Sequence, residues 1–337
     1  MTLRFGLVGA GGIARSYVDV FAGVDDARIV GVADPDLGAA RVLGAALDAR
    51  TAPSFAALAE AVDLDAVIVC TPPVSHPSIA LAAIDAGLGV LCEKPLAIEI
   101  DAAHRMLAAA NAAGTPFTMA TKFRFVDDVL AARALIANGS IGDVIQLENS
   151  FASRVDMRDR WNSNRAVSGG GVLIDNGTHS VDIARSFLGP IDTVLALELP
   201  RTQPLDVEDS VQLLLRAASG ATATIDLSWS CDHTTDTYLQ VYATEGALRV
   251  GWRESAVRSN AAGEWAPFGQ GYDKIRCMRS QVKNFCGALR GTEPVAITAA
   301  DAIASVQVIV AAYRSMALGD WVAVDPVPAT ESASDVA

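Results

Sequence analysis

The sequence predicts an α/β protein in which a doubly wound parallel sheet is followed by an α+β unit with a large, mostly antiparallel open sheet. In residues 1–121, short apolar runs alternate with alanine-rich stretches of helical length, which is typical of parallel strands that helices cover on both faces. After Thr121 the runs lengthen and alternate apolar with polar residues, which is typical of strands with one exposed face. A glycine-rich segment at residues 9–14 joins the first apolar run to the first helical stretch.

The wholly apolar runs are the predicted strands of the parallel sheet, and the stretches between them are its predicted helices. The strands are expected at residues 5–8, 29–33, 66–70, 89–92 and 117–120. The helices are expected to include residues 13–21, 75–86 and 101–113. This alternation predicts a first domain over residues 1–121.

The second domain is expected over residues 122–325. It begins with a predicted helix at 127–137, and Ser219-Gly220 and Glu245-Gly246 are predicted hairpin turns. Helices return near 272–289 and 299–318. The tail, residues 326–337, is rich in Pro, Ser, Thr and Asp and is expected to be disordered. The alternating strands are expected at 144–152, 211–216, 221–229 and 238–243.

Composition narrows the class of protein. The 337 residues include 26 Lys plus Arg and 39 Asp plus Glu, for a net charge of −13. This charge disfavours nucleic acid and anionic membranes as partners. The N-terminus enters a strand at once, without a signal peptide's pattern, and no apolar run reaches the length of a membrane span. The five cysteines form no CxxC pair, so we expect reduced thiols in a cytoplasmic protein.

The segment Gly9-Ala10-Gly11-Gly12-Ile13-Ala14 fits G-x-G-x-x-A, a variant of the Rossmann dinucleotide fingerprint. Gly9 allows the tight turn, Gly11 lets the backbone approach the pyrophosphate, and Ala14 lets helix and strand pack closely. Gly12 and Ile13 open the helix whose N-terminus would face the phosphates. A glycine turn without a ligand is the alternative interpretation.

Asp34 follows the second strand, twenty positions after Ala14, where a carboxylate accepts hydrogen bonds from the adenosine ribose. A carboxylate there repels the 2′-phosphate of NADP, and Pro35 stands where an NADP enzyme often has Arg or Ser. Arg41 is the nearest base that could still accommodate NADP. We therefore expect NAD as the cofactor, with NADP less favoured.

Lys94 lies at the carboxyl end of a predicted parallel strand, where ligands of open α/β sheets bind. A solvated surface pair with Glu93 is the alternative. Asp175 and His179 are four residues apart, so on a helix they would share a face, together with Thr178 and Asp182. His179 could move a proton, and Asp175 could orient it or bind a substrate hydroxyl. A plain helix-stabilising pair, and a metal site formed with Asp182, are the alternatives.

Four segments together resemble the glucose–fructose oxidoreductase and inositol dehydrogenase (Gfo/Idh/MocA) family over nearly the whole chain. They are the fingerprint, Thr71-Pro72-Pro73-Val74-Ser75-His76, Cys92-Glu93-Lys94-Pro95 and the run from Gly169-Gly170-Gly171 through Asp175 to His179. The resemblance implies that Lys94 contacts the reacting hydroxyl, that Glu93 lies near the nicotinamide ribose, and that the Lys94–Pro95 bond is cis. It also implies that His179 is the acid/base and that Asp175 assists it.

The resemblance further implies weaker site residues. Thr71, Pro72 and His76 match a loop along the dinucleotide, although His76 as a simple helix-start residue is an equal alternative. Lys122 and Arg124 match a segment that enters the second domain, where the resemblance implies substrate contacts. The Pro that often follows this segment in the family is absent here, and Val126-Asp127-Asp128 stands in its place. Trp161, after Arg160, and Arg165 precede the glycines as substrate-loop candidates, with plain packing the alternative for Trp161.

These observations predict an oxidoreductase that moves a hydride between NAD and a secondary alcohol or ketone of a sugar, sugar derivative or cyclitol. No metal is expected. The open sheet face predicts a homodimer or homotetramer. Three alternatives stay open: a glycosidase that oxidises its substrate transiently with NAD, a non-catalytic sensor of the same fold, and a reductase of a non-sugar substrate.

Overall fold

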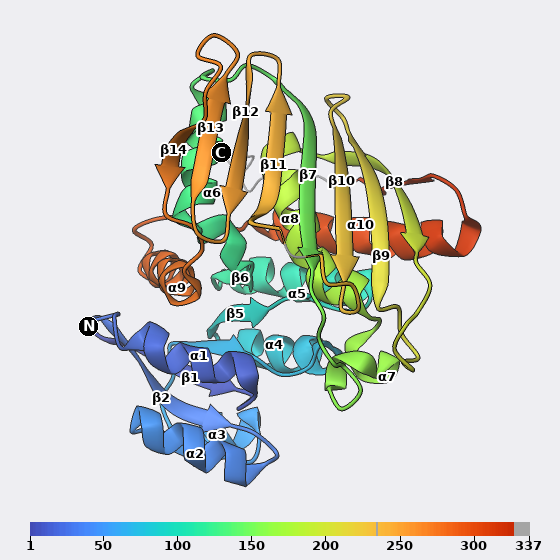
Figure 1. Cartoon of the computed structure of the whole chain (residues 1–337). Helices are drawn as coiled ribbons and strands as arrows, with labels where there is room; N and C mark the ends of the chain where they lie inside the picture. The colour runs from blue at the N-terminus through green and yellow to red at the C-terminus, as the bar shows by residue number, and fades with distance from the viewer. Residues whose placement is uncertain (234, 327–337) are drawn as a thin grey trace, which may run out of the picture.

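The computed structural model describes residues 1–233 and 235–326, and these form two sheets with helices around them (Figure 1). The first sheet has six strands in the order β3-β2-β1-β4-β5-β6, and all its pairings are parallel. The order reverses between β1 and β4, which is the switch point where ligands of such sheets bind. Its strands are β1 (Leu3–Val8), β2 (Ala27–Ala33), β3 (Arg50–Ala52), β4 (Ala66–Val69), β5 (Gly89–Glu93) and β6 (Phe117–Ala120).

Helices cover both faces of the first sheet, and its strands are therefore buried on both sides. One face packs on α1, α2 and α9, and the other packs on α3, α4, α5 and the first half of α10. Two helices from the C-terminal third, α9 and α10, therefore complete the two cores around the N-terminal sheet. These helices are α1 (Gly12–Phe21), α2 (Leu37–Leu47), α3 (Phe55–Ala61), α4 (His76–Asp85), α5 (Ile100–Ala113), α9 (Lys274–Leu289) and α10 (Ala299–Leu318).

The second sheet has nine strands in the order β14-β13-β12-β11-β7-β10-β9-β8-β15. All its pairings are antiparallel except that of β7 with β10. Its strands are β7 (Val144–Ala152), β8 (Ile191–Glu198), β9 (Ser210–Ala217), β10 (Thr222–Ser228), β11 (Thr237–Ala243), β12 (Gly246–Gly251), β13 (Ser255–Ser259), β14 (Ala266–Gly269) and β15 (Val322–Ala323).

The helices of the second unit lie on one side of this sheet, and the other side faces the viewer of Figure 1 without a covering helix. Apolar residues at alternate positions of the strands point toward these helices. They form the core of the second unit with α6 (Asp127–Ala137), α8 (Val172–Leu188) and α10. Short helical turns complete the connections: η1 (Pro73–Ser75), η2 (Lys122–Phe125), η3 (Trp161–Ser163) and α7 (Arg165–Ser168).

The fold class predicted from the sequence is confirmed, and the predicted helices at 127–137 and 299–318 have the bounds of α6 and α10. The short elements α2, β3 and α3 were not predicted. Contrary to expectation, α10 is long and apolar enough to span a membrane, with a mean hydropathy of 1.2. However, 61% of that window is buried within the fold, which makes α10 a core helix. The tail expected to be disordered lies, apart from Pro326, outside the described residues.

Candidate active site

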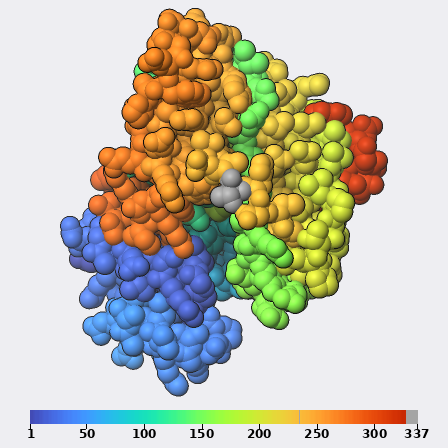
Figure 2. Space-filling view, viewed as in Figure 1, coloured from blue at the N-terminus to red at the C-terminus, as the bar shows by residue number. Residues whose placement is uncertain are grey.

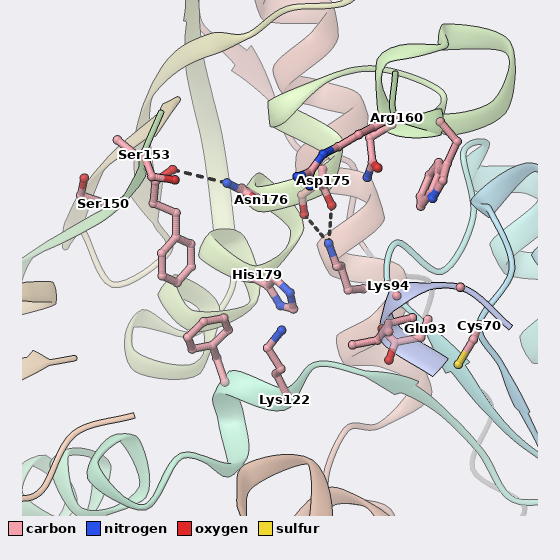
Figure 3. Close-up of a pocket in the computed structure, with 18 of the residues that line it drawn as sticks. Cys70, Glu93, Lys94, Lys122, Ser150, Ser153, Arg160, Asp175, Asn176 and His179 are labelled. Carbon is pink, nitrogen blue, oxygen red and sulfur yellow. Dashed lines mark hydrogen bonds and ion pairs between the residues drawn. The ribbon is translucent and has the colours of Figure 1, made fainter. Parts of the chain in front are cut away.

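A cavity of about 840 Å³ lies between the carboxyl ends of the parallel strands and the lower end of the second sheet. Figure 2 shows the hollow between the N-terminal unit (blue) and the strands of the second sheet (orange). The glycine loop, Thr71, Glu93 and Lys94 line it from the first unit, and Asp175 and His179 line it from α8. The structure therefore brings the two predicted halves of the site, which are far apart in sequence, into one cavity (Figure 3).

The glycine loop leaves room for a ligand. Gly9 has φ +100°, and a Cβ there would lie 2.8 Å from the main-chain carbonyl of Cys70, so the turn requires glycine. A Cβ on Gly11 or Gly12 would meet nothing within 4 Å, and both residues line the cavity. Gly11 caps α1 without a side-chain acceptor, so the first amide groups of the helix face open space. These features fit a dinucleotide pyrophosphate.

Asp34 fixes this loop rather than lining the cavity. Its Oδ2 accepts a hydrogen bond from the amide of Ala10 at 2.7 Å, and its Oδ1 accepts one from the amide of Asp36 at 2.8 Å. The carboxylate thus stands beside the glycine loop at the end of β2. Free lone pairs remain on both oxygens for a ribose.

His76 is fully buried, which corrects its expected place along the dinucleotide. Its Nδ1 lies 2.9 Å from the carbonyl oxygen of Pro95, and its Nε2 lies 2.8 Å from that of Thr71. Both ring nitrogens are therefore occupied by backbone. His76 holds the Thr71 loop against the segment after Lys94, whereas Thr71 itself lines the cavity and Pro72 does not.

Lys94 is held by Asp175. The Nζ of Lys94 donates to Oδ1 of Asp175 at 2.5 Å and to its main-chain oxygen at 3.0 Å. Both side chains are largely buried, with exposed fractions of 15% and 21%. The bond between Lys94 and Pro95 is cis, as expected. An ammonium has three donors, so one remains for a ligand in the cavity.

Glu93 lies beside Lys94 and is buried. Its Oε1 accepts a hydrogen bond from the hydroxyl of Tyr17 at 3.1 Å. Burial raises the pKa of Glu93 above its usual range, and the nearby charges of Lys122 and Lys94 oppose this shift. Glu93 is thus a buried carboxyl group at the cavity wall, and the nearby lysines offset part of the effect of burial on its pKa.

His179 reaches the cavity with its ring, which is only 7% exposed. Its Nδ1 is buried without a hydrogen-bond partner in the described part of the chain, while Nε2 is not among the buried unpaired atoms, so we assign Nε2 to the cavity side. Burial holds the pKa of His179 well below its usual range, and Lys94 and Lys122 lower it further. The imidazole is therefore neutral near pH 7.

No hydrogen bond joins Asp175 to His179 among the described residues, although they share a cavity-facing side of α8 with Asn176. Thr178 and Asp182 do not share that side, contrary to the expectation from spacing. Thr178 donates to the carbonyl of Ile174 at 2.7 Å and lines a separate cavity. Asp182 lies in a buried ion pair, and no group of three or more potential metal-ligand side chains occurs in residues 1–233 and 235–326.

The glycine triplet before α8 makes room for protein, not for a ligand. A Cβ on Gly170 would lie 1.9 Å from the hydroxyl of Tyr313, and one on Gly171 would lie 1.9 Å from the carbonyl oxygen of Glu208. The buried Oε1 of Glu208 accepts hydrogen bonds from the amide of Gly171 at 2.7 Å and the hydroxyl of Tyr313 at 2.7 Å. Glu208 thus caps α8, where a carboxylate is favourable. No local sequence signal indicated this role.

The weaker substrate candidates separate into two groups. Lys122 and Trp161 line the cavity. Arg124 does not, because its guanidinium is buried and pairs with Asp182 at 2.8 Å and with Asp301 at 3.2 Å. Arg165 is also absent from the lining, and its Nη2 lies 3.9 Å from Oε2 of Glu208. The substrate contacts expected for Arg124 and Arg165 are therefore replaced by structural ion pairs.

Sequence reasoning missed part of the far wall of the cavity. Phe123, Phe151 and Trp252 form an aromatic surface there, and ring centroids of Phe123 and Phe151 lie 4.8 Å apart. Asn176 adds an amide group whose Nδ2 donates to the carbonyl of Phe151 at 3.4 Å. An aromatic wall beside polar groups suits the alternating apolar and hydroxylated faces of a sugar ring. These residues come from separate elements, so only the fold assembles them.

The cavity lies at the switch point of the parallel sheet, and its glycine loop fits a pyrophosphate. It also holds side chains that can donate or accept a proton. Together these features define a dinucleotide-dependent oxidoreductase. The sequence matches the NAD-binding Rossmann-fold model of the oxidoreductase family GFO/IDH/MocA over residues 3–121. It matches the GFO/IDH/MocA C-terminal domain over residues 129–249. The chain belongs to this family, and it is an enzyme of the dehydrogenase type.

Relatives of known activity are similar along nearly the whole chain. The inositol 2-dehydrogenase of Rhizobium meliloti (strain 1021) is 28% identical, over 94% of this chain and 98% of its own. The D-xylose 1-dehydrogenase (NADP(+)) 2 of Haloferax volcanii is 29% identical, over 96% and 100%. The crystal structure of GenD2 from gentamicin A biosynthesis, in complex with NAD, is 28% identical with a TM-score of 0.85, over 96% and 97%.

Proposed function

We propose that this enzyme transfers a hydride between NAD and a secondary alcohol or ketone of a sugar, sugar derivative or cyclitol. The observation that carries the proposal is the position of the Lys94 ammonium, which Asp175 holds in the same cavity as the His179 imidazole. The names of the relatives support the substrate class, since they include inositol and xylose dehydrogenases.

Each residue has a part in the proposed reaction. Gly11, Gly12 and Ile13 would hold the dinucleotide, which supplies the hydride acceptor when bound. Lys94 donates its remaining N–H to the reacting oxygen and stabilises the negative charge that develops there. His179, neutral at pH 7, accepts the hydroxyl proton at Nε2. Asp175 keeps the Lys94 ammonium in place.

We assign NAD rather than NADP as the preferred cofactor because the carboxylate of Asp34 stands beside the glycine loop. The relatives include an NADP enzyme, so this preference needs its own test. We also assign the enzyme to the cytoplasm, where the five cysteines, all free in the structure, would remain reduced.

The test is a panel of inositols, aldoses, polyols and glycosides offered to the purified enzyme with NAD, followed by NADH absorbance. We expect steady NADH formation with at least one cyclic polyol or aldose, and its loss in His179→Ala. The matched control is His104→Ala, since His104 lies on α5 outside the cavity. Glycoside cleavage without net NADH would instead favour the glycosidase, and ligand binding without turnover would favour the sensor. Turnover confined to non-sugar carbonyl compounds would favour a reductase of a non-sugar substrate.

A further inference from the structure

Lys122 has an amine group without a partner in the catalytic cavity. It lies on η2, between β6 and α6, and its side chain lines the cavity opposite Lys94 (Figure 3). Lys122 makes no hydrogen bond and no ion pair in the described part of the chain. Its nearest aromatic contact is the Phe123 ring, whose centroid is 5.5 Å from Nζ.

Two other cations with largely buried side chains near this cavity are paired, so the lack of a partner for Lys122 in the described part of the chain is informative. Arg124, two residues further along η2, pairs with Asp182 at 2.8 Å, and Lys94 pairs with Asp175 at 2.5 Å. Burying a charged amine without a partner is unfavourable, and a lysine in such a place readily becomes neutral. A neutral amine beside the reaction centre is a proton acceptor.

His179 needs such an acceptor. If His179 takes the alcohol proton, the resulting imidazolium lies close to the ammonium of Lys94, whose positive charge already disfavours it. Lys94 cannot relieve it, because its ammonium is bound to Asp175. Figure 3 shows the nitrogen of Lys122 pointing toward the ring of His179. Lys122 is therefore the group to which the proton can move.

We infer that Lys122 is a second acid/base residue, which receives from His179 the proton that leaves the substrate hydroxyl. In the oxidation, the carbinol hydride moves to NAD, the hydroxyl proton moves to Nε2 of His179, and the C=O bond forms. The proton then passes from His179 to the neutral Nζ of Lys122, giving an ammonium and a neutral imidazole. In the reduction the same proton returns. This inference rests on the proposed function, since it assumes an alcohol substrate.

The surroundings of Lys122 support a neutral amine. Burial lowers the pKa of Lys122 below its usual range, and repulsion from Lys94 lowers it further. The charged and titratable groups that face it are Glu93 from β5, Lys94 directly after β5, Lys274 and Cys277 from α9, and His179 from α8. Of these, Glu93 and Cys277 favour the ammonium, and they do not cancel the effect of burial.

The first test is kinetic. Lys122→Met should lower kcat by about 10²–10⁴-fold, the usual contribution of a positioned acid/base, with NADH affinity within about twofold of native. Added methylamine or ethylamine should restore part of the turnover. In the native enzyme, kcat/KM for oxidation should rise with pH as Lys122 loses its proton, and this rise should vanish in the variant. The control is Lys283→Met, which removes a charge from the exposed side of α9, outside the cavity, and should leave the profile unchanged.

Loss of activity without amine rescue, and with an unchanged pH profile, would assign Lys122 to substrate binding or structure and overturn the inference. A second measurement needs no substrate: competitive acetylation of the NADH-bound enzyme, read by mass spectrometry from pH 6 to 10. Lys122 should gain reactivity at lower pH than Lys274 and Lys283. If it titrates like those two, the inference fails. If no sugar or cyclitol is oxidised but Lys122 still titrates low, the proposed substrate class fails instead.

Discussion

The Nζ of Lys94, at the end of β5, lies 2.5 Å from Oδ1 of Asp175 in the first turn of α8. This ion pair links the parallel sheet to the helix that carries His179. It places a cation beside the cavity, and among the described residues no carboxylate pairs with the imidazole of His179. Asp175 therefore acts on Lys94 in this structure, and any effect of Asp175 on His179 is indirect.

A double-mutant cycle should reveal this coupling. Asp175→Asn keeps the shape but removes the charge that holds Lys94, so kcat should fall by about tenfold to a hundredfold, less than for a lost acid/base. Once Lys94→Met is present, the same Asp175→Asn change should have a much smaller effect. Steady-state kinetics on the four proteins would measure it, and strictly additive losses would show that the two residues act independently.

His179 is expected to affect chemistry and not cofactor binding. His179→Ala should lower turnover by about 10²–10⁴-fold. NADH affinity, measured by fluorescence titration, should barely change, because the glycine loop proposed to hold the dinucleotide belongs to the other unit, between β1 and α1. Near-native turnover of His179→Ala across the pH range would move the acid/base role to another residue.

Asp34 should set the preference for NAD. Asp34→Asn keeps an acceptor for the amide of Ala10 but removes the charge that repels a 2′-phosphate. The ratio of NADP to NAD affinity should rise by about tenfold, as expected for one nearby charge. Calorimetric titration with both cofactors would measure it, and Asp36→Ser, which retains the cap of α2, is the control. Tighter NADP binding by the native enzyme would contradict the assignment.

The uncovered face of the second sheet should bind a second subunit. On β9, Leu213 and Leu215 face the core while Leu214, between them, is 37% exposed. On the side of β9 that carries Leu214, Arg216 stacks on Trp321 at 5.3 Å, and Trp265 lies 4.8 Å from Arg249. Exposed aromatic and arginine side chains are enriched in protein interfaces.

Light scattering should accordingly give a mass of at least twice 35.1 kDa at micromolar concentration. Leu214→Arg, on the uncovered face of β9, should shift the enzyme toward the monomer, while Gln146→Arg on β7, two strands away, would show whether the interface extends there. A native protein that remains at the monomer mass throughout would refute the oligomer.

The buried histidine should make folding stability depend on pH. The pKa of His179 is lower in the folded chain than its unfolded value of about 6.5, so the unfolded chain binds more protons at acidic pH. Stability is therefore lost as pH falls below about 6.5, toward the folded pKa. The melting temperature should drop less steeply from pH 7.5 to 5 in His179→Gln. Parallel curves for the two proteins would contradict the neutral imidazole.

Much of the first unit was predictable because its signals are local. Apolar runs and helical stretches predicted the parallel sheet, and the spacing of Gly9, Gly11 and Ala14 predicted the strand–turn–helix. Asp175 and His179 were predicted to share a helix face, and both line the cavity. The resemblance to the family located Lys94, whose position at the end of β5 follows from strand order alone.

The sequence by itself determined the class of fold, the glycine loop and the shared helix face of Asp175 and His179, since each depends on neighbours a few residues away. Only the tertiary structure decided their partners: Lys94 for Asp175, Asp182 for Arg124 and Glu208 for the glycine triplet. It also left Lys122 without a partner among residues 1–233 and 235–326. Lys94 and Asp175 are 81 residues apart in the sequence. Several charged residues could pair with Lys94, and no local sequence pattern predicts which of them the packing of the sheet against the helix places beside it.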